Sequence, residues 1–327
     1  MRHRSLDNVF WPDRTCEEAL QIVGLSRDGC RTAIREVSPS ARGYLVGSLA
    51  FGLGNARSDV DIHVFVDSGD GQKEAVTRLS WPGGVTVDLD VIQNEALREL
   101  ISTLASLRIH ATPLGACAIA GGPPRATRRR LSRWLNALPI GDETVPLIPS
   151  DVTTQGLAWL RRDALETALV STALALLASY ENLTDSAKAY FWQRASTALA
   201  ELLVRREGDV TTGEKWLRAV SQRHAIPWPS LQRPDDAHAC WERLGMPFVT
   251  SVGIVEATEA TGNLPFTLEG RSGIGSRQGT VTGQDLVTGC LDQIMADGRG
   301  LMLLKQVASG HVDLSIQRHL LDKELLA

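Results

Sequence analysis

The sequence predicts an α+β fold, in which a mixed sheet with flanking helices precedes a helical domain and a small C-terminal module. Short β-branched runs punctuated by glycine and aspartate fill most of the first part of the chain. Long apolar-periodic stretches with little strand signal follow it. Breaks rich in glycine and proline place the domains at 1–122, 123–225 and 226–327.

Strands and helices alternate in the first domain. Runs rich in β-branched residues, each bounded by glycine or a polar turn, predict strands at Arg42–Gly47, Val60–Val66 and 85–92. The spacing of apolar residues predicts helices at Cys16–Val23, Arg27–Val37, 72–79 and Glu95–Leu107. This alternation indicates a mixed or partly parallel sheet with helices packed against it.

Helices dominate the second domain. Apolar spacing predicts one helix through Leu157 to Tyr180 and another at Ala189–Arg206. In the third domain we expect a glycine-rich loop at 270–283 and helices at 284–296 and 300–308. With residues 312–326 these would form a winged-helix-like or helical module for packing, dimerisation or covering an acceptor site.

Composition narrows the classes of function. Of the 327 residues, 43% are hydrophobic and 22% charged, and a net charge of −4 gives no broad basic surface for nucleic acid. No apolar run reaches the ~20 residues that cross a bilayer, and the N-terminus lacks a secretion signal. The scattered cysteines include no CxxC pair, which disfavours zinc or a disulfide framework. We expect a cytoplasmic protein with reduced thiols and no membrane partner.

The most informative segment is Tyr44–Val66, YLVGSLAFGLGNARSDVDIHVFV. Asp59 and Asp61 are two residues apart, so both side chains leave one face of a strand, roughly 6–7 Å apart. Two such carboxylates repel each other unless a cation lies between them, and Mg²⁺ prefers one or two carboxylates plus substrate phosphates. Gly47-Ser48 ends the neighbouring strand, where glycine permits close approach and the serine hydroxyl and the amides donate to phosphate. The segment predicts a triphosphate and metal site.

A second acidic strand follows at 85–92. In VTVDLDVI the valines and Leu89 form an apolar face, while Asp88 and Asp90 share the other face. Two carboxylates on the polar face of a strand so soon after Asp59 and Asp61 strengthen the prediction of a metal site. His63 lies on the face of Asp59 and Asp61, where it either touches substrate or belongs to the polar face of the strand.

These residues resemble the DNA polymerase β-like nucleotidyltransferase superfamily, especially its minimal and aminoglycoside-type members. The family motif has a hydrophobic residue with Gly-Ser, about ten residues, Asp-x-Asp, and a later strand with hydrophobic-Asp-hydrophobic. It matches Val46-Gly47-Ser48, Asp59-Val60-Asp61-Ile62 and Val87-Asp88-Leu89. The resemblance covers residues 25–100 closely, and Phe51 departs from it where many minimal members have arginine.

The resemblance implies an Mg²⁺-dependent enzyme that transfers NMP, with ATP as the default donor, to a hydroxyl or phosphate of a small-molecule acceptor. Pyrophosphate is released. Asp59, Asp61 and Asp88 are then the catalytic ligands of two Mg²⁺ ions, and Gly47 and Ser48 hold the phosphates. Asp90 is the alternative third metal ligand, or else a supporting group or a base for the acceptor.

Two basic features accompany this motif. Lys215-Trp216 resembles a Lys-Trp pair whose lysine meets the nucleotide phosphates in several families of the superfamily. The alternative is a solvated lysine beside a core tryptophan. Arg128-Arg129-Arg130 and Arg133 form the densest basic cluster, which we interpret as a solvated helix face, with an RNA or phosphate contact as the alternative.

Other functions share these residues. A toxin-like transferase that modifies protein or tRNA, and a cyclic-oligonucleotide synthase, would use the same site. A non-enzymatic nucleotide-binding sensor would normally lack one of the carboxylates. We expect a small-molecule acceptor rather than a nucleic acid, because the basic cluster is small for a partner the size of tRNA. The sequence indicates no oligomeric state.

Overall fold

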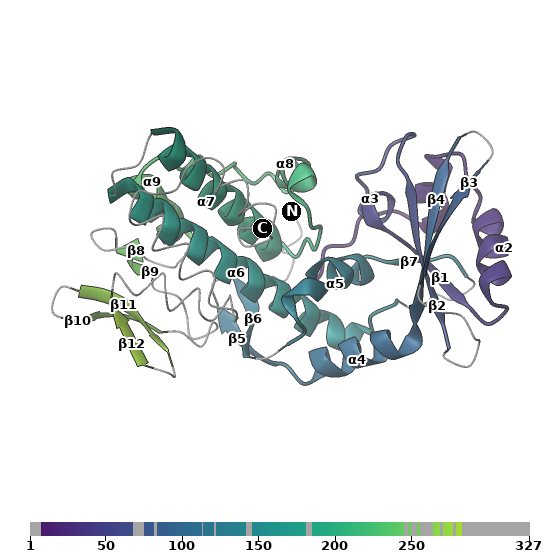
Figure 1. The fold of residues 1–327 in the computed structure, drawn as a ribbon, viewed down its shortest axis with the longest axis horizontal. Coiled ribbons are helices and arrows are strands. Elements are labelled where there is room, and N and C mark those ends of the chain that lie inside the picture. The colour runs from purple at the N-terminus through teal and green to yellow at the C-terminus, as the bar shows by residue number, and fades with distance from the viewer. Residues whose placement is uncertain are drawn as a thin grey trace. The chain divides into compact units, whose positions relative to one another are not determined.

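The computed structural model describes residues 8–67, 75–81, 84–112, 114–120, 122–141, 146–180 and 185–244, and the backbone of five short strands beyond them (Figure 1). The chain divides into two compact units. The first comprises Met1–Arg108, Gly121–Leu160 and Glu207–Arg223, and the second comprises Ile109–Ala120, Arg161–Arg206 and His224–Ala327. The described residues form an α+β structure, as predicted, whereas the three consecutive domains stay a prediction.

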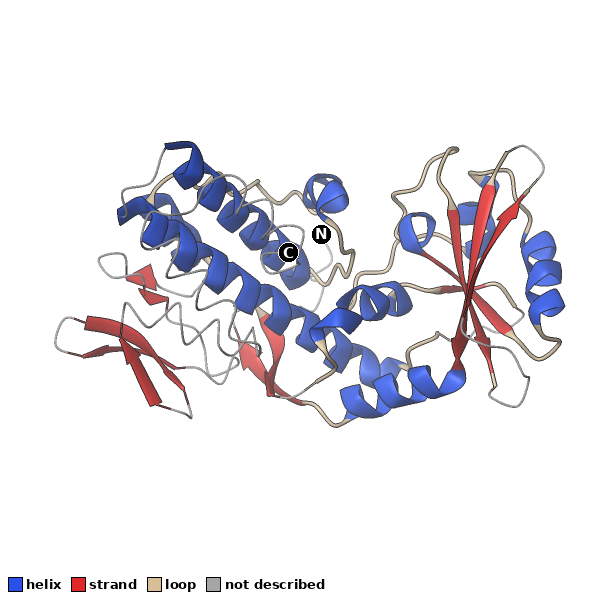
Figure 2. Cartoon of the chain, in the orientation of Figure 1, coloured by secondary structure: helices blue, strands red, loops and turns tan. Residues whose placement is uncertain are grey.

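A five-stranded mixed sheet with the order β3-β4-β2-β1-β7 organises the first unit (Figure 2). Its strands are β1 (Arg42–Val46), β2 (Val60–Val66), β3 (Ala75–Ser80), β4 (Thr86–Gln93) and β7 (Leu138–Pro139). β2 and β4 run parallel, and the other neighbouring pairs run antiparallel. The structure confirms the strands predicted at 42–47, 60–66 and 85–92 to within one residue.

The helix predicted at 72–79 is wrong. Ala75–Ser80 form the edge strand β3, and residues 72–74 lie outside the described residues. The side chains of β3 are mostly exposed, so its own pattern gives weak evidence for either kind of element. Antiparallel pairing with β4, in which Arg78 lies opposite Asp88, determines the strand conformation.

Helices cover both faces of this sheet. The helices of the first unit are α1 (Cys16–Gln21), α2 (Arg27–Val37), α3 (Gly47–Ala50), α4 (Asn94–Ala105), α5 (Arg128–Leu135) and α8 (Glu214–Arg223). A capping box between Thr15 and Glu18 begins α1, and Ser26 caps α2. α1 and α2 share a buried core with Ile62 and Val64 of β2, so the alternate residues of that strand face α5 (Figure 1).

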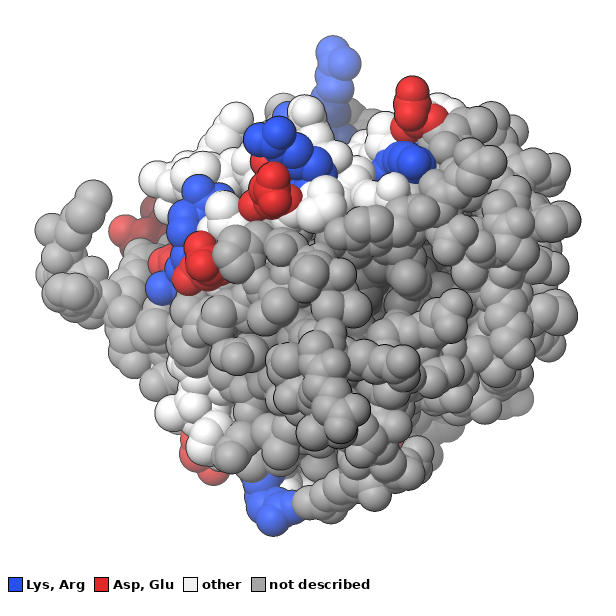
Figure 3. Space-filling model, turned by 90° about the vertical axis from the view of Figure 1, so that its left-hand side faces the viewer, with Lys and Arg blue, Asp and Glu red and all other residues white. Residues whose placement is uncertain are grey.

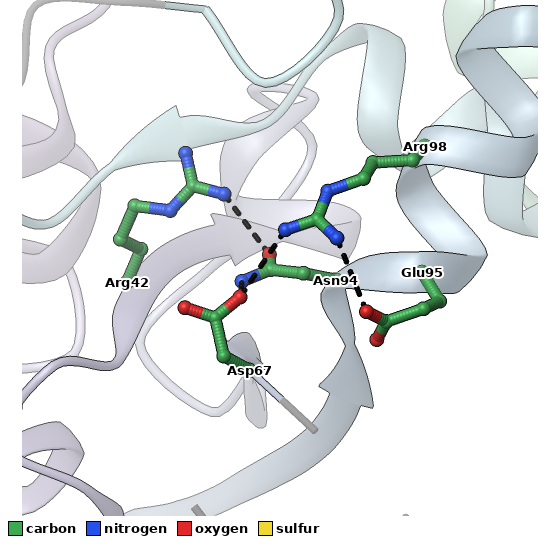
Figure 4. A network of polar contacts seen from close by, with 5 residues as sticks. All are labelled: Arg42, Asp67, Asn94, Glu95 and Arg98. Carbon is green, nitrogen blue, oxygen red and sulfur yellow. Dashed lines mark hydrogen bonds and ion pairs between the residues drawn. The ribbon is translucent and has the colours of Figure 1, made fainter. Parts of the chain in front are cut away.

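A polar network fixes α4 to the end of β2 (Figure 4). Buried Asn94 accepts a hydrogen bond from Arg42 Nη2 at 3.0 Å and donates to Asp67 Oδ1 at 2.8 Å. Arg98 donates to the same Asp67 oxygen at 3.3 Å and to Glu95 Oε1 at 3.1 Å. The Asn94 amide is therefore satisfied at both its oxygen and its nitrogen, as a buried polar group requires. This network lies at the opposite end of β2 from Asp61.

Long helices dominate the second unit. Buried Arg161 donates to the carbonyls of Arg205 and Arg206 at 3.0 and 3.3 Å, so its guanidinium satisfies the C-terminal end of a helix. The predicted long helices are confirmed, and the first of them is divided between the units after Leu160. The elements are α6 (Ser150–Tyr180), α7 (Asp185–Arg206), α9 (Pro234–Arg243), β5 (Arg108–Thr112) and β6 (Gly115–Ala120).

The glycine-rich loop predicted at 270–283 is wrong. β10 (Leu264–Leu268), β11 (Arg271–Ser276) and β12 (Gly279–Thr282) form an antiparallel sheet, and β8 (Phe248–Val249) pairs with β9 (Ile254–Val255). Backbone pairing satisfies the N–H and C=O groups of β11 even where glycines supply no side chain. The predicted helices at 284–296 and 300–308, and residues 312–326, lie outside the described residues.

Within the part of the chain that the structure describes, no helix has both the length and the apolar character needed to cross a bilayer. Cys16, Cys30, Cys117 and Cys240 are buried and form no disulfide with one another. Burial raises the pKa of Cys16 to about 12 and that of Cys30 to about 11, so both are thiols at neutral pH. Cys290 lies outside the described residues.

Gly43 of β1 provides a test of the packing between α2 and the sheet. A Cβ at this position would overlap Cδ1 of Ile34 and lie 2.9 Å from its Cγ1. Gly43→Ala should therefore lower the free energy of unfolding by roughly 1–3 kcal/mol, measured by urea denaturation. In an Ile34→Ala background the same substitution should cost less, and an equal cost in both backgrounds would contradict this packing.

Candidate functional site

A polar pocket of about 720 Å³ lies in the first unit, and chain segments distant in sequence form its walls. The pocket is lined by Gly47, Ser48, Phe51, Asn55, Arg57, Ser58, Asp59, Asp61, Arg128, Arg129, Arg133, Thr212, Gly213, Lys215 and Trp216. Five of the predicted site residues therefore share one cavity: Gly47, Ser48, Asp59, Asp61 and Lys215. Asp88 and Asp90 are not among the lining residues.

Gly47 allows the turn after β1 to lie close to the carboxylate of Asp61. It follows β1 with a φ of 75°, in the left-handed region that favours glycine. A Cβ on Gly47 would overlap Oδ2 of Asp61 and lie 3.2 Å from its Cγ. The antiparallel register, which pairs Val46 with Asp61, brings the two residues together. The carboxylate of Asp61 therefore occupies the space that a side chain at position 47 would need.

Three carboxylates, those of Asp59, Asp61 and Asp88, lie close together at the start of β2. Asp61 lies opposite Asp88 in the parallel pairing of β2 with β4, and Asp88 and Asp90 occupy the partly exposed face of β4, as predicted. Burial raises the pKa of Asp61, Arg133 opposes this shift, and the negative charges of Asp88 and Asp59 add to it. A cation at this point would relieve both the burial penalty and the repulsion.

Arginines already contact two of these carboxylates. Arg78 donates to both oxygens of Asp88, with Nε–Oδ1 at 2.8 Å and Nη2–Oδ2 at 2.9 Å, and this hydrogen bonding lowers the pKa of Asp88. Nη2 of Arg133 lies 3.5 Å from Oδ2 of Asp61. Sequence reasoning missed Arg78, because its segment was predicted as a helix.

The structure places three arginines of the basic cluster at the pocket, where the solvated helix face and the phosphate contact both stay predictions. Arg128, Arg129 and Arg133 line the pocket, whereas Arg130 packs over the ring of Trp134 at 5.7 Å. The spacing of Arg129 and Arg133, four residues apart in a helix, places both on one face. That spacing is the signal in the sequence that could have indicated a shared role for these two arginines.

Asp59 and Asp61 fit a divalent cation as a two-carboxylate site. Both carboxylates lie in the same pocket, and burial, with a smaller contribution from neighbouring carboxylates, raises the pKa of Asp61. Among the described residues, no group of three His, Cys, Asp or Glu side chains is arranged to hold a metal. Mg²⁺ commonly takes one or two carboxylates and completes its shell with phosphate and water, so two suffice. Asp88 as a third ligand stays a prediction.

His63 of β2 is buried, and it is not among the residues that line the pocket. Trp134 Nε1 donates to His63 Nδ1 at 2.8 Å, so the neutral ring carries its proton on Nε2, 3.6 Å from Oδ2 of Asp90. Burial, together with the positive charges of the nearby arginines of α5, lowers the pKa of His63 to about 3. His63 of β2 is therefore an uncharged side chain that accepts a hydrogen bond from α5, and its Nε2 makes no hydrogen bond.

Helix α8 carries Lys215 and Trp216 into the pocket, with Lys215 Nζ 4.8 Å from the centre of the Trp216 ring. At the other end of α8, Arg223 Nη2 donates to the carbonyl of Phe51 at 2.8 Å. Arg223 Nη1 lies 3.3 Å from the buried carboxylate of Asp209. Arg223 thus fixes α8 against the loop after α3, a role that no pattern in the sequence predicted.

Comparisons with known proteins give little further information. No protein-family model matches the chain, and no curated protein matches it. A solved structure described as a nucleotidyltransferase-like protein from Exiguobacterium sibiricum is similar over 67% of this chain and 73% of that chain. The sequence identity is 15% and the TM-score is 0.30, so this similarity carries no argument about function.

Asp61→Asn is expected to raise the melting temperature of the metal-free protein at neutral pH. A raised carboxyl pKa means that the ionised form costs folding free energy above the folded-state pKa. That cost disappears as the pH falls below the usual value of 3.8, so the advantage of the variant should shrink on acidification. Calorimetry from about pH 8 down to about pH 4 measures both effects. A less stable variant at neutral pH would reverse the assigned sign.

Proposed function

We propose that the protein is a Mg²⁺-dependent nucleotidyltransferase, which moves NMP from an NTP to a hydroxyl or phosphate of a small acceptor and releases pyrophosphate. The observation that carries the proposal is the meeting, in one pocket, of Gly47-Ser48 with Asp59, Asp61 and Lys215. Phosphate-binding and metal-binding groups converge there from segments more than 150 residues apart in the sequence, between Asp61 and Lys215. ATP is the donor we take as the default, by analogy.

In this proposal each wall of the pocket has a separate task. The amides and hydroxyl of Gly47-Ser48 donate to the β- and γ-phosphates, and Lys215 adds a flexible positive charge opposite them. Asp59 and Asp61 would hold the metal ions. Asp88 would become a third ligand by giving up its hydrogen bonds to Arg78 and binding metal instead. Bound Mg²⁺ supplies Lewis-acid polarisation of the α-phosphate and charge neutralisation at the leaving oxygen.

Asp90 is the group that we assign to proton removal from the acceptor. It lies two residues beyond Asp88 on the same face of β4, and His63 stands behind it with Nε2 3.6 Å from its carboxylate. A carboxylate at this position accepts the proton of the acceptor hydroxyl. The oxygen then forms its bond to the α-phosphorus in line with the bond that breaks, and pyrophosphate leaves with that electron pair.

The distribution of charge favours a compact acceptor over a large nucleic acid. The whole chain has a net charge of −4. On the face drawn in Figure 3, basic and acidic side chains of the described residues lie next to each other rather than in regions of one sign. Extended contact with a nucleic acid backbone relies on several clustered cations. In the first unit such clustering occurs at the pocket itself.

The direct test is incubation of the protein with each of the four α-labelled NTPs and Mg²⁺, with a metabolite pool or with an RNA pool. We expect label in a small product together with released pyrophosphate. Asp59→Asn should reduce transfer by at least ~10²-fold because it removes a metal ligand. The matched control is Asp28→Asn, a carboxylate on α2 with a 90% exposed side chain, which should transfer normally. Lack of product with every NTP and both pools would refute the proposal.

The two acidic residues of β4 should differ in their effect on turnover. Asp88→Asn should cost at least ~10²-fold if Asp88 binds metal, and Asp90→Asn should cost less if it only assists proton transfer. Titration with Mn²⁺, followed by electron paramagnetic resonance, should show weaker binding for the Asp88 variant alone. The reverse order would assign the third metal ligand to Asp90.

A further inference from the structure

The pocket carries more positive charge than a metal-bound nucleotide requires. Its charged lining residues are Arg57, Arg128, Arg129, Arg133, Lys215, Asp59 and Asp61. An NTP has about four negative charges, which two Mg²⁺ ions neutralise. The five cations of the lining exceed the two carboxylates by three positive charges. The arginines of α5 are then in excess of what the donor and its metals need.

The position of these arginines is unfavourable for the helix that carries them. Arg128 and Arg129 occupy the first turn of α5, which has no acidic residue and no side-chain cap. Cations are disfavoured there, because the positive end of the helix dipole repels them. Arg133 follows one turn later and is largely buried beside Asp61, with its side chain 20% exposed. An anion bound among the three would offset both the repulsion and the burial of charge.

We infer that Arg128, Arg129 and Arg133 form a subsite for a phosphate group of the acceptor, so that the acceptor is a phosphorylated compound. This inference rests on the proposed function, which assigns the donor triphosphate to Gly47-Ser48 and Lys215. A phosphomonoester has a charge of about −1.5 to −2 at pH 7 and three strong acceptor oxygens. The guanidinium group of an arginine can donate two parallel hydrogen bonds to two oxygens of one phosphate. The phosphate belongs either to a small metabolite or to the 5′ end of an RNA.

Calorimetric titration of the full chain, saturated with Mg²⁺ and α,β-methylene-ATP, tests the subsite. Inorganic phosphate and phenyl phosphate should both bind to this saturated protein. Arg129→Gln should weaken phosphate binding by about tenfold or more, because a charge-assisted hydrogen bond is lost. The affinity for the nucleotide analogue should stay within about threefold. Arg129 is exposed, so the variant should fold normally.

Arg130→Gln is the matched control. Arg130 is the next residue on α5 and has the same charge, but it packs over Trp134 and does not line the pocket. This variant should change the affinity for neither phosphate nor the analogue. If Arg130→Gln weakens phosphate binding as much as Arg129→Gln does, the effect comes from the overall positive charge of α5, and the subsite is overturned.

The remaining outcomes separate this inference from the proposed function. Competition between phosphate and the analogue would place the arginines at the donor triphosphate and overturn the inference, as would absence of phosphate binding. If the wild type binds phosphate through Arg129 but does not bind the analogue, the anion subsite stands and the proposed transferase function fails.

A final comparison identifies the source of the phosphate. A 5′-phosphorylated RNA oligonucleotide that binds far more tightly than phenyl phosphate would assign the group to RNA, whereas equal affinities would assign it to a small molecule. Both results support a phosphate subsite. Equal binding of the oligonucleotide with and without its 5′ phosphate would overturn it.

Discussion

The contact between the Gly47 backbone and the Asp61 carboxylate is the constraint on which the rest of the pocket depends. Antiparallel pairing of Val46 with Asp61 sets it, and the positive φ of Gly47 leaves the carboxylate the space that a side chain would fill. Parallel pairing of β2 with β4 then places Asp88 beside Asp61. These two registers therefore position the Gly47-Ser48 turn and the acidic residues together.

The pocket is built at a cost to local stability. Burial and neighbouring carboxylates raise the pKa of Asp61, burial lowers the pKa of Arg133, and α5 begins with arginines at the unfavourable end of its dipole. Elsewhere in the same unit, α1 and α2 begin with side-chain caps and pack on a buried apolar core. Violations concentrated in one cavity are typical of residues retained for function rather than for folding.

Sequence patterns predicted the elements whose signal is local. Alternation identified β2 and β4, helical periodicity identified α6 and α7, and the glycine and aspartate spacing identified one wall of the pocket. The patterns failed at β3 and at β11, where pairing with a neighbouring strand determines the conformation.

The sequence patterns also did not predict side-chain contacts between residues that are far apart along the chain. The contact of Arg78 with Asp88 follows from the register of two strands, one of which was predicted as a helix. Arg223 meets the carbonyl of Phe51 across 172 residues, a separation at which spacing contains no information. The arginines of α5 were visible as a cluster, but only the packing of Trp134 on His63 and Phe65 turns that helix toward Asp61.

The two arginine–carboxylate pairs differ in how readily a metal can replace them. The side chain of Arg78 is 70% exposed, so water can solvate its guanidinium when Asp88 binds a metal ion in the proposed reaction. Arg133 is 20% exposed beside Asp61, and its charge requires another partner once that carboxylate binds metal. A phosphate entering the same pocket supplies that partner. In the proposed reaction, metal at Asp61 and phosphate at Arg133 therefore favour each other's binding, because each relieves the charge that the other leaves unbalanced.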